Sequence, residues 1–270
     1  MRALLLLLAL PLWATDDVNT ILRHVVAADH RNEKNAQQYT YIQETIRFAL
    51  DKDGQMRQTS TVTHEVIFVE GLKYEKLVAR EGKPLTPKEQ AKVDKDMSQT
   101  AAERRKRAHP TSPGGAVART SPFNHKTTDL GSLSELLTLF DNRLIGEEEI
   151  RGHKTWVIES TPKKASEQMS MHEKDVLGFG KKFWVDQKDN MVVRAIHTVV
   201  EQGSAMRPGS TLTFEYEKID ADTWEPVTLT MDFSLAKQAI FKPTGRTVYT
   251  MHDFHKFDVQ STITVVGPGK

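Results

Sequence analysis

Few residues in this sequence have the type and spacing needed for chemistry. His252 and His255 form the motif H-D-F-H, and two histidines can hold a metal ion when their rings face the same space. On a β-strand, positions three apart point to opposite faces, so this pair could share an ion only across a bulge. The apolar alternation is lost around Asp253, which predicts a bulge or a sheet edge. The other histidines are scattered along the chain, so we expect no metal site and no cofactor.

The acidic run Glu147-Glu148-Glu149 is the second candidate, because paired carboxylates can act as acid and base. On a strand Glu147 and Glu149 share a face and Glu148 opposes them, and with Ile145 and Ile150 around them the run is typical of a solvated strand end. The sequence contains no G-x-S-x-G, no H-E-x-x-H and no phosphate loop. We therefore predict a protein that is not an enzyme. Catalysis stays open only if dispersed carboxylates and histidines converge in space.

The basic run Arg104 to Arg107 ends a predicted helix, where positive charge suits the helix dipole. The alternative is contact with phospholipid head groups or another anionic partner. The chain has 37 basic and 36 acidic residues, and this near-zero balance gives no support to nucleic-acid binding.

The first residues, MRALLLLLALPLWA, have a basic start, an apolar run and a small residue, as a secretory signal peptide does. We predict a signal over residues 1–14, cleavage near Ala14 and a periplasmic or secreted protein. The apolar run is shorter than the roughly 20 residues of a membrane span, so no stable transmembrane segment is expected after cleavage. The absence of cysteine excludes disulfides and a lipid-anchored form.

Apolar spacing predicts the elements that would position any site. Residues 17–35 have the three- and four-residue steps of an amphipathic helix, and Asp53-Gly54 predicts a hairpin turn between two long strands. Thr86 and Glu89 begin a polar, exposed helix, and Ser132 and Glu135 begin a short apolar helix that should cover the sheet. Residues 162–180 are predicted to be a loop. Pairs of strands are expected over 144–161, turning at Arg151-Gly152, and over 181–201, turning at residues 186–190. Single strands are expected at 72–79, 211–219, 227–233 and 247–257.

These patterns predict a mainly β protein of nine or ten antiparallel strands with two or three helices. Strict alternation indicates one buried and one wet face. One curved sheet would then have an apolar inner face, either a packed core or a surface that leaves room for an acyl chain. The residues that would bind this ligand are Ile46, Phe48, Val66, Phe68, Trp156, Ile158, Phe214, Tyr216, Leu229 and Met231, with Ile42, Val62 and Leu212 beside them.

The order of elements, with LIGEEEIRGHKTWVIESTP followed by GKKFWVDQKDNMVVRA, resembles the LolA/LolB-like superfamily of periplasmic lipoprotein-sorting carriers. The resemblance covers roughly residues 18–257. It implies an α+β fold with a single curved antiparallel sheet, an unclosed β-barrel whose concave face is covered by helices. Residues 15–266 would form one such domain, with a helical and loop insertion at about 86–122 that the compact carriers lack.

Two functions follow from this resemblance. The first is a non-enzymatic periplasmic protein that binds a lipid or an acylated protein on the apolar concave face. The alternative is an envelope interaction or sensor domain of the same fold, with a filled core, that binds a protein partner. The two differ in whether the concave face is empty in the apo protein.

Overall fold

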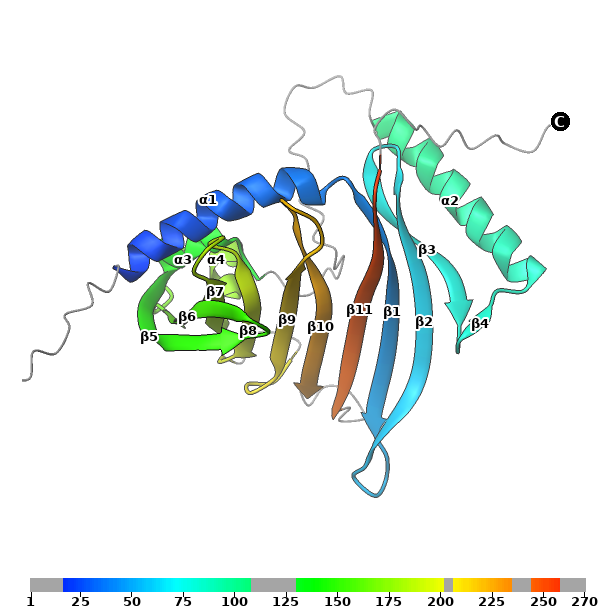
Figure 1. Ribbon diagram of the computed structural model, residues 1–270. Helices are drawn as coiled ribbons and strands as arrows, with labels where there is room; N and C mark the ends of the chain where they lie inside the picture. Colours follow the sequence, from blue (N-terminus) through cyan, green and yellow to red (C-terminus); the bar gives the residue numbers. More distant parts are fainter. Residues whose placement is uncertain (1–16, 108–129, 202–205, 235–243, 258–270) are drawn as a thin grey trace, which may run out of the picture.

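The computed structural model describes residues 17–107, 130–201, 206–234 and 244–257 (Figure 1). The predicted signal peptide and residues 108–122 of the predicted insertion lie outside these ranges. Within them the chain forms a large curved sheet with helices on both of its faces.

The sheet has 11 strands in the order β4-β3-β2-β1-β11-β10-β9-β8-β7-β6-β5. Each strand pairs antiparallel with its neighbours, and β4 and β5 remain at the two edges, so the barrel is not closed. The predicted fold class is confirmed. The strands are β1 Tyr39–Leu50, β2 Met56–Val69, β3 Leu72–Arg80, β4 Lys83–Pro84, β5 Phe140–Ile150, β6 His153–Pro162, β7 Phe179–Asp186, β8 Val192–Val199, β9 Thr211–Lys218, β10 Trp224–Ser234 and β11 Thr244–Lys256.

The described helices are α1 Val18–Ala36, α2 Pro87–Arg107, the 3-10 turn η1 Leu133–Glu135, α3 Leu136–Leu139 and α4 Met171–Leu177. The first three predicted helices are confirmed, the third as η1 and α3 together. The fourth lies in the segment predicted to be a loop. Ser170 accepts a hydrogen bond from Glu173 N and Glu173 caps it in return, so the S-x-x-E spacing was a signal for α4 that the polar composition obscured.

The long β1–β2 hairpin turns where the sequence predicts it. Asp51 Oδ1 accepts hydrogen bonds from the backbone N–H of Asp53 and Gln55, both at 2.9 Å, and Gly54 has a φ of 75°. On β11 Asp253 has a φ of 53°, and the register with β1 shifts between Thr40 and Ile42, which together form the predicted bulge.

Among the described residues, the larger of two core clusters lies on the concave face. Helix α1 crosses this face, and its apolar stripe, Ile21, Leu22 and Val25, is 1% exposed (Figure 1). Helices α3 and α4 lie inside the curve of β5 to β8 and add Leu136, Leu139, Val176 and Leu177 to the same cluster. The strands contribute Tyr41, Val66, Phe140, Ile158, Phe179, Phe183, Val185, Val192, Ala195, Val199, Leu212, Phe214, Leu229, Tyr249 and Met251.

Helix α2 packs on the opposite face. Tyr74 of β3 is opposite Ile67 of β2, and Ile67 points away from the concave face, to which Val66 and Phe68 point. The centre of the Tyr74 ring lies 5.9 Å from the Arg104 guanidinium of α2. Arg104 donates hydrogen bonds to the carbonyl oxygens of the β2–β3 turn, at Val69, Leu72 and Lys73. The predicted excursion is therefore tied to the sheet, and Ala101 of this helix is fully buried.

Arg151, in the turn between β5 and β6, fixes the curl of the sheet. Its backbone has a φ of 49°, and its guanidinium donates to the carbonyl oxygens of Val193 on β8 and Tyr216 on β9 at 3.1 and 2.9 Å. It also pairs with Glu215 at 3.2 Å. One side chain thus connects the edge of the sheet to strands three and four positions away.

Replacing Arg151 should destabilise the protein. Loss of two charge-assisted hydrogen bonds predicts that Arg151→Ala lowers the free energy of unfolding by about 2–3 kcal/mol in urea denaturation. Arg143→Ala is the matched control, since Arg143 on β5 makes only an exposed ion pair with Glu159, and should cost under about 1 kcal/mol. Equal losses in the two variants would show that Arg151 does not fix the curl.

Candidate functional site

The concave face contains a continuous row of side chains that runs across six strands. The register places these residues opposite one another in turn, and opposed residues of an antiparallel pair point to the same face. The row consists of Ile158, Phe183, Ala195, Phe214, Leu229 and Tyr249. Every one of these residues is buried, and we call the set the apolar row.

Eight of the ten residues predicted to bind a ligand lie on this face. Ile158, Phe214, Leu229 and Val66 are buried, whereas Phe68, Trp156, Tyr216 and Met231 are partly exposed. The other two do not belong here. On β1, Thr45 is opposite Tyr249 of the apolar row, so Ile46 and Phe48 point to the other face, as does Ile42. The prediction for these residues was wrong because the buried face of β1 carries polar side chains.

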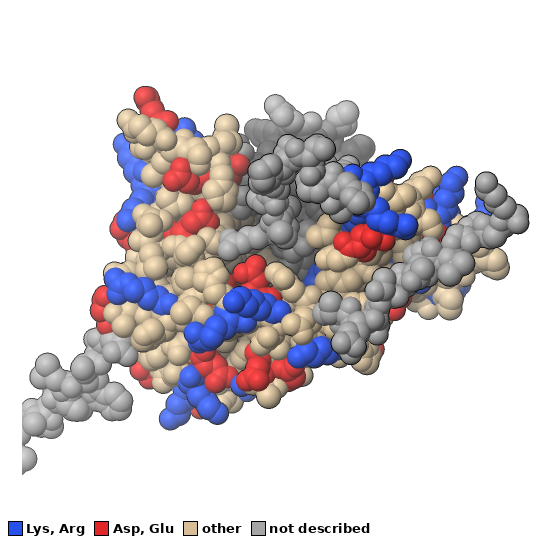
Figure 2. All heavy atoms as spheres, turned by 90° about the horizontal axis from the view of Figure 1, so that it is seen from above, with Lys and Arg blue, Asp and Glu red and all other residues tan. Residues whose placement is uncertain are grey.

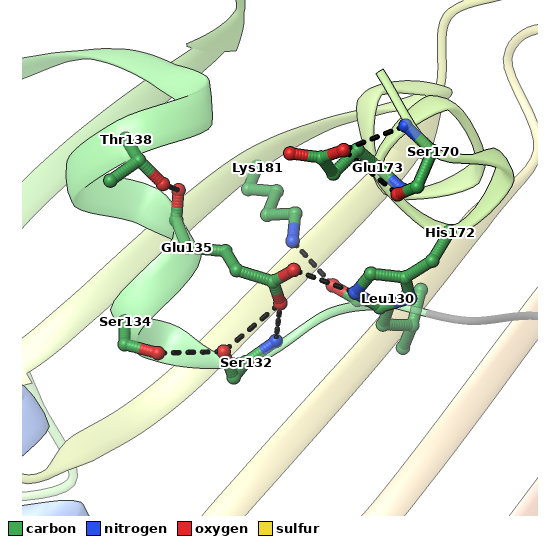
Figure 3. Close-up of polar contacts among 9 residues, drawn as sticks. All are labelled: Leu130, Ser132, Ser134, Glu135, Thr138, Ser170, His172, Glu173 and Lys181. Carbon is green, nitrogen blue, oxygen red and sulfur yellow. Dashed lines mark hydrogen bonds and ion pairs between the residues drawn. The ribbon is translucent and has the colours of Figure 1, made fainter. Parts of the chain in front are cut away.

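Helices α3 and α4 cover one end of the apolar row and are joined by a polar contact, which we call the latch (Figure 3). Glu135 Oε1 lies 2.6 Å from His172 Nε2 of α4, and Glu135 Oε2 accepts from Ser132 N at 2.5 Å. Burial by itself raises the pKa of Glu135, but the hydrogen bonds from Ser132 and His172 outweigh it and bring the pKa below its ordinary value. The carboxylate that holds the two helices together therefore stays ionised.

Lys181 of β7 ties the same cover to the sheet. Its ammonium donates to Leu130 O at 2.5 Å and lies 4.7 Å from the centre of the Phe140 ring (Figure 3). The backbone at Gly131 follows with a φ of 71°, and a Cβ there would come within 2.8 Å of Val176 on α4. Only glycine therefore lets this segment lie against α4.

His197, opposite Lys181, lies beneath the cover. Burial and the nearby Lys181 charge lower the pKa of His197 to about 3, so this imidazole stays neutral. Its ring lies between Phe183 and Phe214, with centroids 5.9 and 5.5 Å away. The histidine acts as part of the apolar core rather than as a base.

A second part of the concave face is polar, and we call it the polar patch: Tyr41, Gln43, His64, Lys73 and Glu225. Tyr41 and Gln43 lie two positions apart on β1, so both point to its buried face, and Gln43 is opposite His64 of β2. Lys73 Nζ lies 4.9 Å from the centre of the Tyr41 ring. Glu225 is only 4% exposed and acts electrostatically on both Tyr41 and Lys73.

Burial dominates the ionisation of the polar patch. It raises the pKa of Glu225 to about 7, although the Lys73 ammonium opposes the shift. It lowers the pKa of Lys73, which the Glu225 charge partly restores. It also raises the pKa of Tyr41, helped by Glu225, and lowers the pKa of His64, so both remain neutral near pH 7.

Sequence reasoning missed the polar patch. Tyr41, Gln43 and Thr45 alternate with Ile42 and Ile46 along β1, and the more apolar set was assigned to the core. The period of two identifies the two faces of a strand but does not say which one is buried.

The residues singled out at first do not converge on a catalytic site. His252 Nδ1 lies 3.1 Å from Oδ2 of its neighbour Asp253. Among the described residues, no three His, Asp or Glu side chains are grouped closely enough to hold a metal ion. Glu147 to Glu149 lie exposed on β5, where Glu148 accepts a hydrogen bond from Trp184 Nε1 at 2.7 Å. Arg104 donates hydrogen bonds to carbonyl oxygens at the β2–β3 turn, and Arg105 Nε pairs with Glu70 Oε1 at 3.0 Å.

The surface around these elements carries mixed charge. Seen from above, Lys and Arg side chains of the described residues are interleaved with Asp and Glu (Figure 2).

A cavity of about 230 Å³ lies on the α2 side of the sheet, between Ile67, Lys76 and Met97. In the described part of the chain, no helix is both long and apolar enough to span a bilayer.

Fold and site together define a class: an unclosed antiparallel sheet whose concave face is covered by helices. A family model described as that of an uncharacterized protein matches residues 120–260, over half of the chain, and the chain belongs to this family. The search of curated proteins found no match.

Solved structures provide more distant comparisons. A DUF1329 family protein from Desulfovibrio piger is 16% identical, with 92% of this chain and 96% of that chain covered and a TM-score of 0.38. A domain described as an outer membrane lipoprotein-sorting protein from Vibrio parahaemolyticus is 12% identical, with the same coverage and a TM-score of 0.40. A LolA superfamily protein from Nitrosomonas europaea is 12% identical, with 91% and 96% covered and a TM-score of 0.33. The third of these is described as a member of the superfamily that the sequence resembles.

The buried Glu225 predicts a stability that depends on pH. Because the folded state raises its pKa from 4.5 to about 7, the folded state holds the proton more tightly than the unfolded chain does. Stability should therefore fall as pH rises from 4.5 to about 7, by at most about 3 kcal/mol, and level off above. In urea unfolding at several pH values, Glu225→Gln should flatten this slope, whereas Glu147→Gln, at an exposed position, should retain it. An unchanged slope in Glu225→Gln would contradict the assignment.

Proposed function

We propose that this protein is a non-catalytic binding protein of the cell envelope that takes up an acyl chain on the concave face of its sheet. The observation that carries the proposal is the apolar row, a band of buried side chains that one open sheet presents to a cover made of helices. No second sheet closes over it within the described residues. Separating helices from this row exposes a surface suited to a hydrocarbon chain.

The energetics support an acyl ligand. Each methylene that leaves water contributes about 0.8 kcal/mol, so a chain of ten or so carbons could replace the contacts that the displaced helices give up. Helices α3 and α4 have only four and seven residues, and helices this short depend on their packing rather than on intrinsic stability. They are therefore the part of the cover that we expect to move.

The resemblance of the sequence to lipoprotein-sorting carriers supports the same class of ligand, and the predicted signal peptide supports a periplasmic location. The candidate site residues are the eight predicted ones that lie on the concave face: Val66, Phe68, Trp156, Ile158, Phe214, Tyr216, Leu229 and Met231.

Native mass spectrometry tests the proposal directly. The mature protein, purified from a periplasmic extract without detergent, should carry a mass excess that organic extraction removes and that is identified as lipid. The extracted protein should regain mass when it is incubated with fatty acid or phospholipid. A bare mass, with no gain after incubation, would overturn lipid binding and favour the alternative, an interaction domain with a filled core that binds a protein partner.

Weakening the latch should loosen the cover. His172→Ala removes the contact between Glu135 and α4, a partly exposed hydrogen bond worth about 1 kcal/mol. Amide hydrogen exchange in α3 and α4 should then be roughly threefold to tenfold faster, and lipid uptake should quicken. His24→Ala is the matched control, because His24 is exposed on α1. If both variants exchange at the rate of the original protein, the latch does not hold the cover.

A further inference from the structure

We infer that the polar patch is the head-group subsite of the ligand, and that it selects an acyl ligand with a neutral head bearing hydroxyl groups, such as a monoacylglycerol. The inference rests on the proposed function, because it assumes that the acyl chain lies on the concave face. The apolar row can bind the acyl chain but cannot distinguish one polar head group from another.

The first support is that the polar atoms of the patch are buried without hydrogen-bond partners. Tyr41, Gln43 and Glu225 are 3%, 2% and 4% exposed. Among the described residues, nothing pairs with Tyr41 Oη, Gln43 Oε1, Glu225 Oε1 or the Nδ1 atom of His64. An unpaired buried polar group costs about 1–3 kcal/mol, so four of them together are a large penalty in the free protein. A ligand that pairs with them recovers that cost.

The second support is the position of the patch beside apolar side chains of the same face. The ring of Phe254 lies 5.4 Å from the ring of Tyr41, and Val66 is directly opposite Tyr41 on β2. Met251, opposite Gln43 on β11, is also buried in the core cluster. A head group in the patch would therefore continue directly into an acyl chain on the apolar surface.

The mixture of donors and acceptors selects the head group. Gln43 Oε1 and the Glu225 carboxylate need donors, whereas the Lys73 ammonium donates and the Tyr41 hydroxyl can do either. The Lys73 ammonium makes no hydrogen bond or ion pair that the structure records among the described residues, and it lies over the Tyr41 ring. A hydroxyl group both donates and accepts, so two hydroxyls on a glycerol head satisfy both kinds of atom.

The other common head groups fit less well. A fatty-acid carboxylate only accepts, so it would leave Gln43 Oε1 unpaired and bring a second negative charge to Glu225. A methyl ester has no donor at all. These differences make oleate and methyl oleate suitable comparison ligands, since both keep the chain of monooleoylglycerol.

Competition binding with delipidated full-length protein tests the inference. Each ligand displaces an anthroyl-labelled stearate, and monooleoylglycerol should bind roughly tenfold or more tightly than methyl oleate or oleate. Tyr41→Phe removes one hydroxyl and Gln43→Met removes the amide at similar size. Each should reduce the preference for monooleoylglycerol about threefold to tenfold, with binding of methyl oleate unchanged. Tyr41→Phe should also fold, since the lost hydroxyl has no hydrogen-bond partner among the residues that the structure describes.

Tyr74→Phe is the matched control, because Tyr74 lies under α2 on the opposite face, and it should leave the preference intact. Equal affinities for monooleoylglycerol and methyl oleate, or a preference that survives in both patch variants, would overturn the head-group inference and leave the proposed function standing. If none of the three ligands displaces the labelled stearate, the proposed function fails, and the inference fails with it.

Discussion

The packing of α1 into the concave face is the contact on which the rest of the structure depends. A sheet of 11 antiparallel strands with two free edges must bury one face, and the strands alone cannot do so without closing. Ile21, Leu22 and Val25 supply the missing side of the core and reach strands that are distant in sequence. Arg151 then holds the curl that brings the edge strand β5 toward β9. Helix α1 contacts both β5 and β10, which lie far apart in the strand order of the sheet, and Arg151 joins the β5–β6 turn to β8 and β9.

The concave face serves two purposes that conflict. Under α3 and α4 it is an apolar core, in which even His197 is kept neutral by burial. Near β1 and β3 it buries Gln43 and Glu225 with polar atoms left unpaired, which lowers the stability of the free protein. Proteins keep such unfavourable groups chiefly where a ligand or a mechanism uses them. That conflict separates a binding face from an ordinary core, and it underlies the proposal that the face receives both a chain and a head group.

The helices on the two faces have different roles. Helix α2 is 21 residues long and largely exposed, yet Arg104 fixes it to three carbonyl oxygens of one turn. Helices α3 and α4 are much shorter, and each buries only two apolar side chains almost completely, while the Glu135 carboxylate contacts His172 of α4. Their attachment therefore depends on packing against the apolar row, and a ligand that competes for the row competes directly with them. The proposed acyl ligand would therefore displace this short pair rather than the long helix α2.

The sequence by itself determined the element types and their order. Period-two alternation in β9 and β10, the turn at Asp53-Gly54 and the capping pair Ser132 and Glu135 are local signals, and each is confirmed. Local signals could not decide which face of β1 is buried, because that depends on the register with β2 and β11 and on what covers the sheet. They also could not bring Glu225 of β10 next to Tyr41 and Lys73, which lie far from it in the chain. Strand pairing brings Tyr41, Gln43, His64 and Lys73 together, and Glu225 joins them from β10, so only the tertiary structure could reveal the polar patch.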